Sequence, residues 1–179
     1  MQNNTFSGGQ TIEKVIDAPS ADASDDHNRT THIWFTAGEI GGGLELIFDF
    51  GVSYDITTLH FWNYDGEAYD VDEVNFTFYD SLGGSIGMET IMPPLGTASN
   101  NKATDIPLVS PLNTRSVTAF LTGDNRQVDF QNIGFSAFLS DPDIDPEVPL
   151  PPVAPIPLPA AGWMLLAAIC GLGGMRRFR

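Results

Sequence analysis

LELIFDFGVSYDITTLHFWNY, residues 44–64, alternates apolar and polar side chains over much of its length. The apolar residues of its first part fall on one face of an extended chain, and they are Leu44, Leu46, Phe48 and Phe50. Glu45 and Asp49 fall on the opposite face. Alternation with a period of two is typical of a strand that buries one face. We therefore predict a strand here, a turn at DFGVSYD and a second strand beyond it.

Other runs repeat the alternation, and they are EVNFTFY (73–79), SVTAFLTG (116–123) and NIGFSAFL (132–139). Turn-rich pieces separate the runs, as in YDGEAYD (64–70), YDSLGGS (79–85) and TGDNRQ (122–127). No segment before the C-terminal tail has a helical period. Short strands joined by turns rich in Gly and Asp predict an all-β sandwich or barrel.

The charge balance excludes one class of partner. Asp and Glu number 23 against 8 Lys and Arg, which gives a formal net charge of −15. Ahead of the tail the basic residues are only Lys14, Arg29, Lys102, Arg115 and Arg126. Binding of nucleic acid needs a basic patch that neutralises phosphates, so we expect no such partner. The single cysteine, Cys170, lies in the tail, which excludes a disulfide framework for the body of the chain.

The tail has two parts. Residues 148–175 carry no charge, and all six prolines of this run precede Ala160. A helix tolerates proline only in its first turn, so residues 160–175 are predicted to form one apolar helix of about 24 Å. This is short of the ~30 Å hydrocarbon core, although Trp163 at one end and arginines at the other extend it. We expect a membrane span, the alternative being a buried helix. The arginines of 176–179 belong on the cytoplasmic side, which places the acidic body outside.

This tail resembles the PEP-CTERM class of bacterial sorting signals. The motif IPLPA is similar to the VPLPA variant of that class and comprises Ile156, Pro157, Leu158, Pro159 and Ala160. The resemblance implies that an exosortase in the membrane removes the tail and passes the exported protein to the cell envelope or extracellular matrix. Residues 1–10, MQNNTFSGGQ, have neither the basic nor the apolar region of a signal peptide, so export requires a leader that they do not supply.

The body resembles discoidin-type domains, also called coagulation factor C-type domains. The resemblance rests on the order of its segments, with Phe50 standing where the family has leucine after the first strand. The similar segments are VIDAPSADASDDHNRTTHIWF (15–35), residues 44–64, VDEVNFTFYDSLGG (71–84), TRSVTAFL (114–121) and QNIGFSAF (131–138). It implies an eight-stranded jelly-roll β-sandwich of the galactose-binding-like kind. The expected organisation is an N-terminal segment (1–11), this sandwich (12–139), an acidic and Pro-rich linker with the sorting motif (140–159), a transmembrane helix (160–175) and a basic end (176–179).

Small sandwiches of this kind bind ligands with loops at one end, and sugars are held by aromatic faces and planar polar groups. We therefore expect a glycan site among Trp34, Trp62, Tyr64, Tyr69 and either Arg115 or Arg126. The alternative for Trp34 and Trp62 is that they are core residues. The alternative for Arg115 is that it packs and forms hydrogen bonds within the domain, as the arginine at this place often does in the family it resembles. The three histidines are not part of any catalytic motif, so the sequence favours a binding module over an enzyme.

A structural calcium ion is a further implication of the resemblance. The matching positions are Asp17, with Asp22, Asp25 and Asp26 nearby, then Thr30 or Thr31, and finally Asn132. The family usually has Glu where this chain has Asn132, and the loss of a carboxylate weakens a site for calcium. The alternative is that ADASDD (21–26) is an ordinary solvated acidic loop.

Taken together, the sequence predicts an exported envelope or matrix protein whose sandwich binds exopolysaccharide or another glycan. The alternatives are a structural matrix protein that assembles through protein contacts and, more weakly, a secreted hydrolase with two close carboxylates in a cleft.

Overall fold

The computed structural model describes residues 3–6, 11–28, 33–35, 43–124 and 127–140. For residues 3–6, 33 and 34 it describes the backbone alone. The elements are β1 (Asn3–Phe6), the short 3-10 helix η1 (Ile12–Ile16), β2 (Ile33–Phe35), β3 (Gly43–Asn63), β4 (Glu73–Tyr79), β5 (Ser85–Ile91), β6 (Thr104–Thr122) and β7 (Phe130–Leu139).

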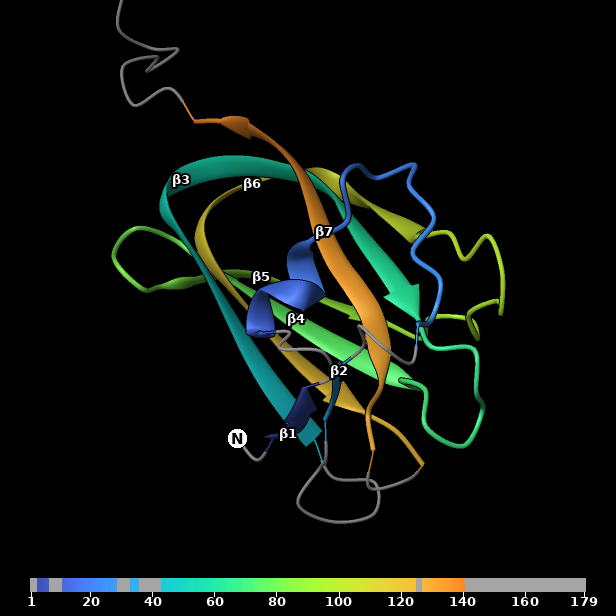
Figure 1. Cartoon of the computed structure of the whole chain (residues 1–179). Coiled ribbons are helices and arrows are strands. Elements are labelled where there is room, and N and C mark those ends of the chain that lie inside the picture. Colours follow the sequence, from blue (N-terminus) through green and yellow to red (C-terminus); the bar gives the residue numbers. More distant parts are fainter. Residues whose placement is uncertain (1–2, 7–10, 29–32, 36–42, 125–126, 141–179) are drawn as a thin grey trace, which may run out of the picture. The chain divides into compact units, whose positions relative to one another are not determined.

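The main sheet is antiparallel, with the strand order β5-β4-β6-β3-β7, and β1 pairs separately with β2. Its two long strands, β3 and β6, bend together (Figure 1). Residues 43–49 of β3 pair with residues 116–122 of β6, beside β4 and β5. Beyond a register shift, residues 54–61 of β3 pair with residues 104–114 of β6, beside β7. The bend thus folds one sheet into two layers.

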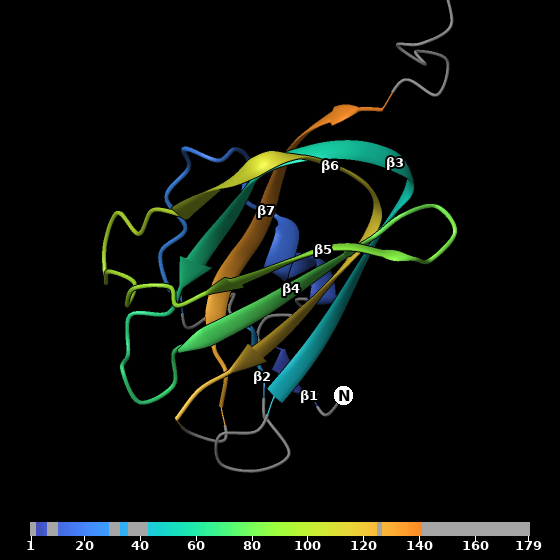
Figure 2. The same ribbon diagram turned by 180° about the vertical axis from the view of Figure 1, so that it is seen from behind.

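The turn predicted at DFGVSYD is instead this bend within a continuous strand. Gly51 has a φ of +79°, a conformation that glycine adopts without steric cost. Its N–H donates to Asp49 Oδ1 at 2.9 Å, which supports the corner. Figure 2 shows the layer of β4 and β5 in front, with β7 and η1 behind it.

The core lies between the two layers. On β4, Val74, Phe76 and Phe78 are fully buried and alternate with half-buried residues, as the alternation predicts. The rings of Phe48 and Phe50 pack edge-on against the ring of Phe135 in the other layer, with centroid distances of 5.2 and 5.3 Å. Close packing of such rings stabilises the contact between the layers beyond the area that it buries.

The all-β fold is confirmed, and the strands predicted by alternation lie in β3, β4, β6 and β7. The two strands predicted on either side of DFGVSYD are one strand, and β1, β2 and β5 were not predicted. The described part of the chain has seven strands, whereas the resemblance implies eight. The described residues include no helix that is long and apolar enough to cross a membrane. The linker, the IPLPA motif and the predicted apolar helix lie outside the described residues.

Candidate functional site

Three loops meet where β3 ends, and we call their joint surface the loop platform: residues 17–28, 64–70 and 92–103. The buried side chain of Asn63, the last residue of β3, closes the second loop. Its Nδ2 donates to the carbonyls of Val71 at 3.0 Å and Pro94 at 3.1 Å. Its Oδ1 accepts from the N–H groups of Tyr64 at 2.9 Å and Val71 at 3.0 Å. One amide therefore fixes both ends of this loop and links it to the third.

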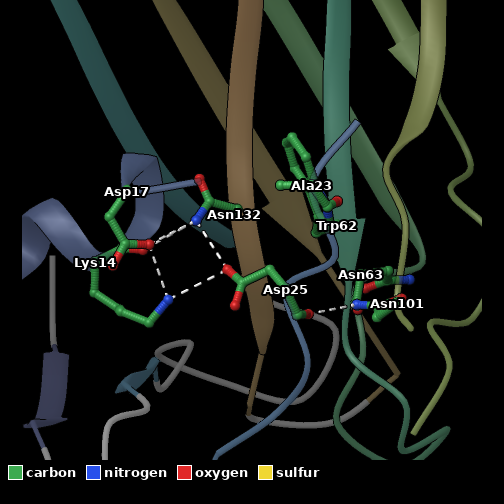
Figure 3. Close-up of polar contacts among 8 residues, drawn as sticks. All are labelled: Lys14, Asp17, Ala23, Asp25, Trp62, Asn63, Asn101 and Asn132. Atoms are coloured by element: carbon green, nitrogen blue, oxygen red, sulfur yellow. Dashed lines mark hydrogen bonds and ion pairs between the residues drawn. The ribbon is translucent and has the colours of Figure 1, made fainter. Parts of the chain in front are cut away.

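Asn101 joins the first loop to the other two (Figure 3). Its Nδ2 donates to the carbonyls of Asn63 at 2.9 Å and Asp25 at 3.2 Å. Its own N–H donates to Asp26 Oδ1 at 2.6 Å. A Cβ at Gly96 would lie 2.3 Å from the Asn63 carbonyl oxygen, so only glycine allows this approach. Buried polar groups that are paired in this way rigidify the backbone around them.

The platform presents aromatic rings to its surface. Tyr64 and His27 contact each other edge to face, with ring centroids 4.9 Å apart. Tyr69 is 43% exposed, and its carbonyl accepts from the Asp129 N–H at 2.7 Å. Asp65, Glu67 and Asp26 lie in the same loops. This arrangement offers an aromatic face and several oxygen acceptors to a ligand.

The other expected glycan-site residues lie elsewhere. Trp62 is 1% exposed, and its Nε1 donates to the Ala23 carbonyl at 3.0 Å (Figure 3). Its ring therefore supports the first loop and has no free face for stacking. Trp34 lies in β2 opposite Thr5. Arg126 lies outside the described residues. Arg115 lies at the bend, where it donates to Asp49 and to the Gly51 carbonyl.

Two of the expected metal ligands, Asp17 and Asn132, come together with Asp25 and Lys14. Asn132 Nδ2 donates to Asp17 Oδ1 and Asp25 Oδ2, both at 2.9 Å, and to the Lys14 carbonyl at 3.3 Å. Lys14 Nζ lies 2.9 Å from Asp17 Oδ1 and 3.2 Å from Asp25 Oδ2. Asp22 contributes its carbonyl, which accepts from Lys102 Nζ. Thr31 lies outside the described residues.

This arrangement does not fit calcium. Calcium requires six to eight oxygen ligands around one point. Here two nitrogen donors, Lys14 Nζ and Asn132 Nδ2, contact the carboxylate oxygens that would have to face the ion. No group of three or more His, Cys, Asp or Glu side chains is placed for a metal within the described ranges.

His60 forms a network that the sequence did not indicate. Its Nδ1 lies 2.7 Å from Asp105 Oδ1, and its Nε2 lies 2.7 Å from Ser136 Oγ. Ser136, His60 and Asp105 are thus linked in the same order as the side chains of a Ser-His-Asp catalytic triad. Asp105 is 61% exposed, however, and Ser136 does not line the adjacent cavity. The three residues come from β6, β3 and β7, and the network ties these strands together.

Asp129 is the second polar group that the sequence did not indicate. Burial raises its pKa to about 7, against the opposing effect of a hydrogen bond from the Phe35 N–H at 3.3 Å. Burial also raises the pKa of Asp70, and the charges of Asp72 and Glu67 add to that effect. Carboxyl groups under the loop platform are thus held closer to their neutral form.

A cavity of about 540 Å³ lies between η1, the first half of β3 and β7. Its apolar walls include Val15, Leu46, Phe48, Ile133 and Phe135. Exposed Ile12, Ile16 and Ile47 are also among its lining residues. Ala18, Ser20 and Ala21 also line the cavity, so it borders the first loop of the loop platform.

Comparison with known proteins identifies the fold of this chain. No family model matches the sequence, and no curated protein matches it. The structure is similar to the lectin domain of lectinolysin complexed with Lewis B antigen, with a TM-score of 0.51, 11% identity and coverage of 76% of this chain and 89% of that chain. A second similar structure is CBM32-1 from a family 31 glycoside hydrolase of Clostridium perfringens, with a TM-score of 0.49, 12% identity and coverage of 77% and 92%. A third is a fucose binding module from Streptococcus pneumoniae, with a TM-score of 0.46, 15% identity and coverage of 68% and 82%. The likeness to the lectin domain identifies the fold as an antiparallel sandwich of the galactose-binding-like kind.

Proposed function

We propose that the chain is a carbohydrate-binding module and that the glycan binds at the loop platform. The observation that carries the proposal is the buried pair Asn63 and Asn101, which orders three loops around an exposed aromatic surface. A preordered site loses little conformational entropy on binding. The similarity in fold to a lectin domain complexed with Lewis B antigen supports the same proposal.

The charge of the platform narrows the glycan class. Asp65, Glu67 and Asp72 lie in or beside the second loop and Asp22 and Asp26 lie in the first, against one lysine, Lys102, in the third. A cluster of one sign repels ligands of the same sign and attracts the opposite sign. The bound glycan is therefore neutral or cationic, and a polysaccharide rich in uronic acids is disfavoured.

The test is binding of the full chain to an array of neutral, cationic and acidic glycans, followed by calorimetry on the best ligand. Replacement of the exposed ring in Tyr69→Ala weakens binding by about tenfold, because stacking on an aromatic face is lost. Leu82→Ala is the matched control, since Leu82 is 94% exposed in the turn between β4 and β5, away from the platform. Equal affinity of the two variants, or no binding to any glycan, contradicts the proposal.

A structural matrix protein is the second candidate, and a different surface favours it. Val52, Phe138 and Leu139 are each at least half exposed at the bend of β3, where Phe138 and Leu139 pair with Asp55 and Tyr54. Exposed apolar side chains that lie close together mark surfaces that bind other proteins. Analytical ultracentrifugation distinguishes the candidates, because assembly without glycan binding favours the matrix role and a monomer that binds glycan favours the module.

We also propose that the protein acts at the cell envelope or matrix after an exosortase removes its tail at IPLPA. The support is the order of proline motif, apolar run and terminal arginines. Loss of the three terminal arginines takes the formal charge from 8 − 23 = −15 to 5 − 23 = −18. Intact-mass measurement on protein from its native host tests this, and a mature form that retains Arg179 contradicts it.

We propose no enzyme activity. The network of Ser136 and His60 provides a specific check, because a reactive serine would be labelled by a fluorophosphonate and a structural one would not.

A further inference from the structure

The cluster of Lys14, Asp17, Asp25 and Asn132, which we call the lysine latch, holds three parts of the chain together. Lys14 lies in η1, the two aspartates lie at the end of η1 and in the first loop, and Asn132 lies in β7 (Figure 3). The Lys14 side chain is 13% exposed and that of Asp25 is 17% exposed. Both charges are therefore largely removed from water, and each depends on its partner.

The oxygens that face the latch are all paired without an ion. Three oxygens converge on the cluster, from Asp17, Asp25 and the Lys14 carbonyl, and every one of them accepts from nitrogen. Lys14 Nζ lies 2.9 Å from Asp17 Oδ1 and 3.2 Å from Asp25 Oδ2, so the ammonium offsets part of the negative charge of the two carboxylates.

The orientation of Asn132 adds an independent observation. Its Oδ1 is buried and has no hydrogen-bond partner, while its Nδ2 contacts all three oxygens. The opposite orientation would place Oδ1 against two carboxylates and a carbonyl, which repel it. The observed orientation leaves Oδ1 unsatisfied, which costs free energy, but it allows Nδ2 to donate to the oxygens of the latch.

We propose that the Lys14 ammonium is an internal cation that replaces a divalent metal ion at this position, so that the first loop is ordered without calcium. A calcium ion would have to displace the ammonium and reverse the Asn132 amide. When the lysine charge is removed, the same reversal supplies Oδ1 as a fourth oxygen beside Asp17, Asp25 and the residue 14 carbonyl, and water supplies the remaining ligands that calcium requires. Substitution of Lys14 therefore creates a calcium-dependent protein from a calcium-independent one.

The latch also acts on the loop platform through the first loop. This loop supplies the Ala23 carbonyl to Trp62, the Asp25 carbonyl to Asn101 and Asp26 Oδ1 to the Asn101 N–H. His27, which contacts Tyr64, follows directly. If the proposed glycan function holds, binding at the platform is unaffected by EDTA.

The experiment is thermal unfolding of the full chain in excess EDTA and in about 5 mM calcium chloride, a concentration at which a micromolar site raises stability by several kcal/mol. The wild type has the same Tm in both. Lys14→Met keeps the aliphatic stem and loses the charge, so its Tm falls by about 5 °C in EDTA and calcium restores most of the loss. Lys102→Met is the control, because Lys102 donates to the carbonyl of Asp22 in the same loop and lies outside the latch. That variant stays insensitive to calcium.

A calcium-induced rise in the wild-type Tm, or heat of binding when calcium chloride is titrated into the wild type, overturns the proposal. So does a Lys14→Met variant whose Tm ignores calcium. Lys14→Gln, which retains N–H donors without the charge, is the second variant if Lys14→Met does not fold, and it too must gain a response to calcium. None of these measurements involves a glycan, so their failure is separate from failure of the proposed function.

Discussion

The two ends of the sandwich are ordered by different means. At the loop platform, side-chain amides that are nearly inaccessible to solvent hold loops that have few ladder hydrogen bonds of their own. At the bend, residues 49–54 remain part of strand β3, and the neighbouring ladders with β6 and β7 supply the order. Here the side-chain contacts are exposed, as in the ion pair of Arg115 with Asp49.

Substitutions are therefore expected to change stability by different amounts at the two ends. A loop without a ladder depends on a few buried side-chain hydrogen bonds, and each lost partner leaves a buried group unsatisfied. Exposed contacts at the bend are replaced by water with little loss. The expected sensitivity is therefore concentrated at the loop platform.

The largest effect is expected for Asn63→Ala. The substitution removes four hydrogen bonds to the loop backbone and leaves buried carbonyl and N–H groups unpaired. The free energy of unfolding falls by about 3–5 kcal/mol, which urea denaturation measures. Asn113→Ala is the matched control, because Asn113 is exposed near the bend and donates to Asp55 at 3.2 Å. An equal loss in both variants contradicts the comparison.

Asp129→Asn is expected to have the next largest effect, and it depends on pH. The pKa of Asp129 is raised from 3.8 to about 7 in the folded state, so the folded protein holds the proton more tightly than the unfolded chain. The contribution of this protonated carboxyl to the free energy of unfolding is fully present below about pH 4 and is lost as the pH rises to about 7. It does not change further above that pH. The neutral asparagine avoids the buried charge, and above pH 8 the variant is more stable than wild type by about 2–3 kcal/mol.

Denaturation of both proteins between pH 4 and pH 9 measures this difference. The advantage of Asp129→Asn shrinks toward zero at the acidic end. If the difference in stability between the two proteins is the same at every pH, the buried charge of Asp129 is not its cause.

Gly51→Ala tests the corner of the bend. An alanine at a φ of +79° costs about 1 kcal/mol, and no atom lies within 4 Å of its Cβ to add a clash. Calorimetry shows a small fall in Tm, while binding at the loop platform stays unchanged. A loss of glycan affinity in this variant shows instead that the two ends are coupled.

Arg115→Ala has the smallest expected effect. Arg115 and Asp49 have side chains that are 38% and 64% exposed, so their ion pair is screened by solvent. The loss of stability stays below about 0.5 kcal/mol and vanishes at high salt. Denaturation at low and high salt measures it, and a loss above about 1 kcal/mol shows that the exposed contacts of the bend matter as much as buried ones.

The sequence alone determined the all-β class and strands within β3, β4, β6 and β7, but it did not indicate β1, β2 or β5. Alternation in residues 44–50 and 73–79 places Leu44, Leu46, Val74, Phe76 and Phe78 in the core, because a strand that buries one face must alternate. The resemblance to discoidin-type domains gave the galactose-binding-like sandwich. These features are local in the chain or follow from its order, and they require no knowledge of which strands become neighbours.

Only the tertiary structure decided which polar residues are buried together. Lys14 and Asn132 are 118 positions apart, and His60 and Ser136 are 76 apart, so no sequence pattern brings them into contact. The same is true of Trp62, whose Nε1 donates to the carbonyl of Ala23, 39 positions away in the first loop. The physical reason is that alternation sets the face on which a side chain lies, whereas the register of β3 with β6 and β7 and the closure of the loops set what that side chain meets.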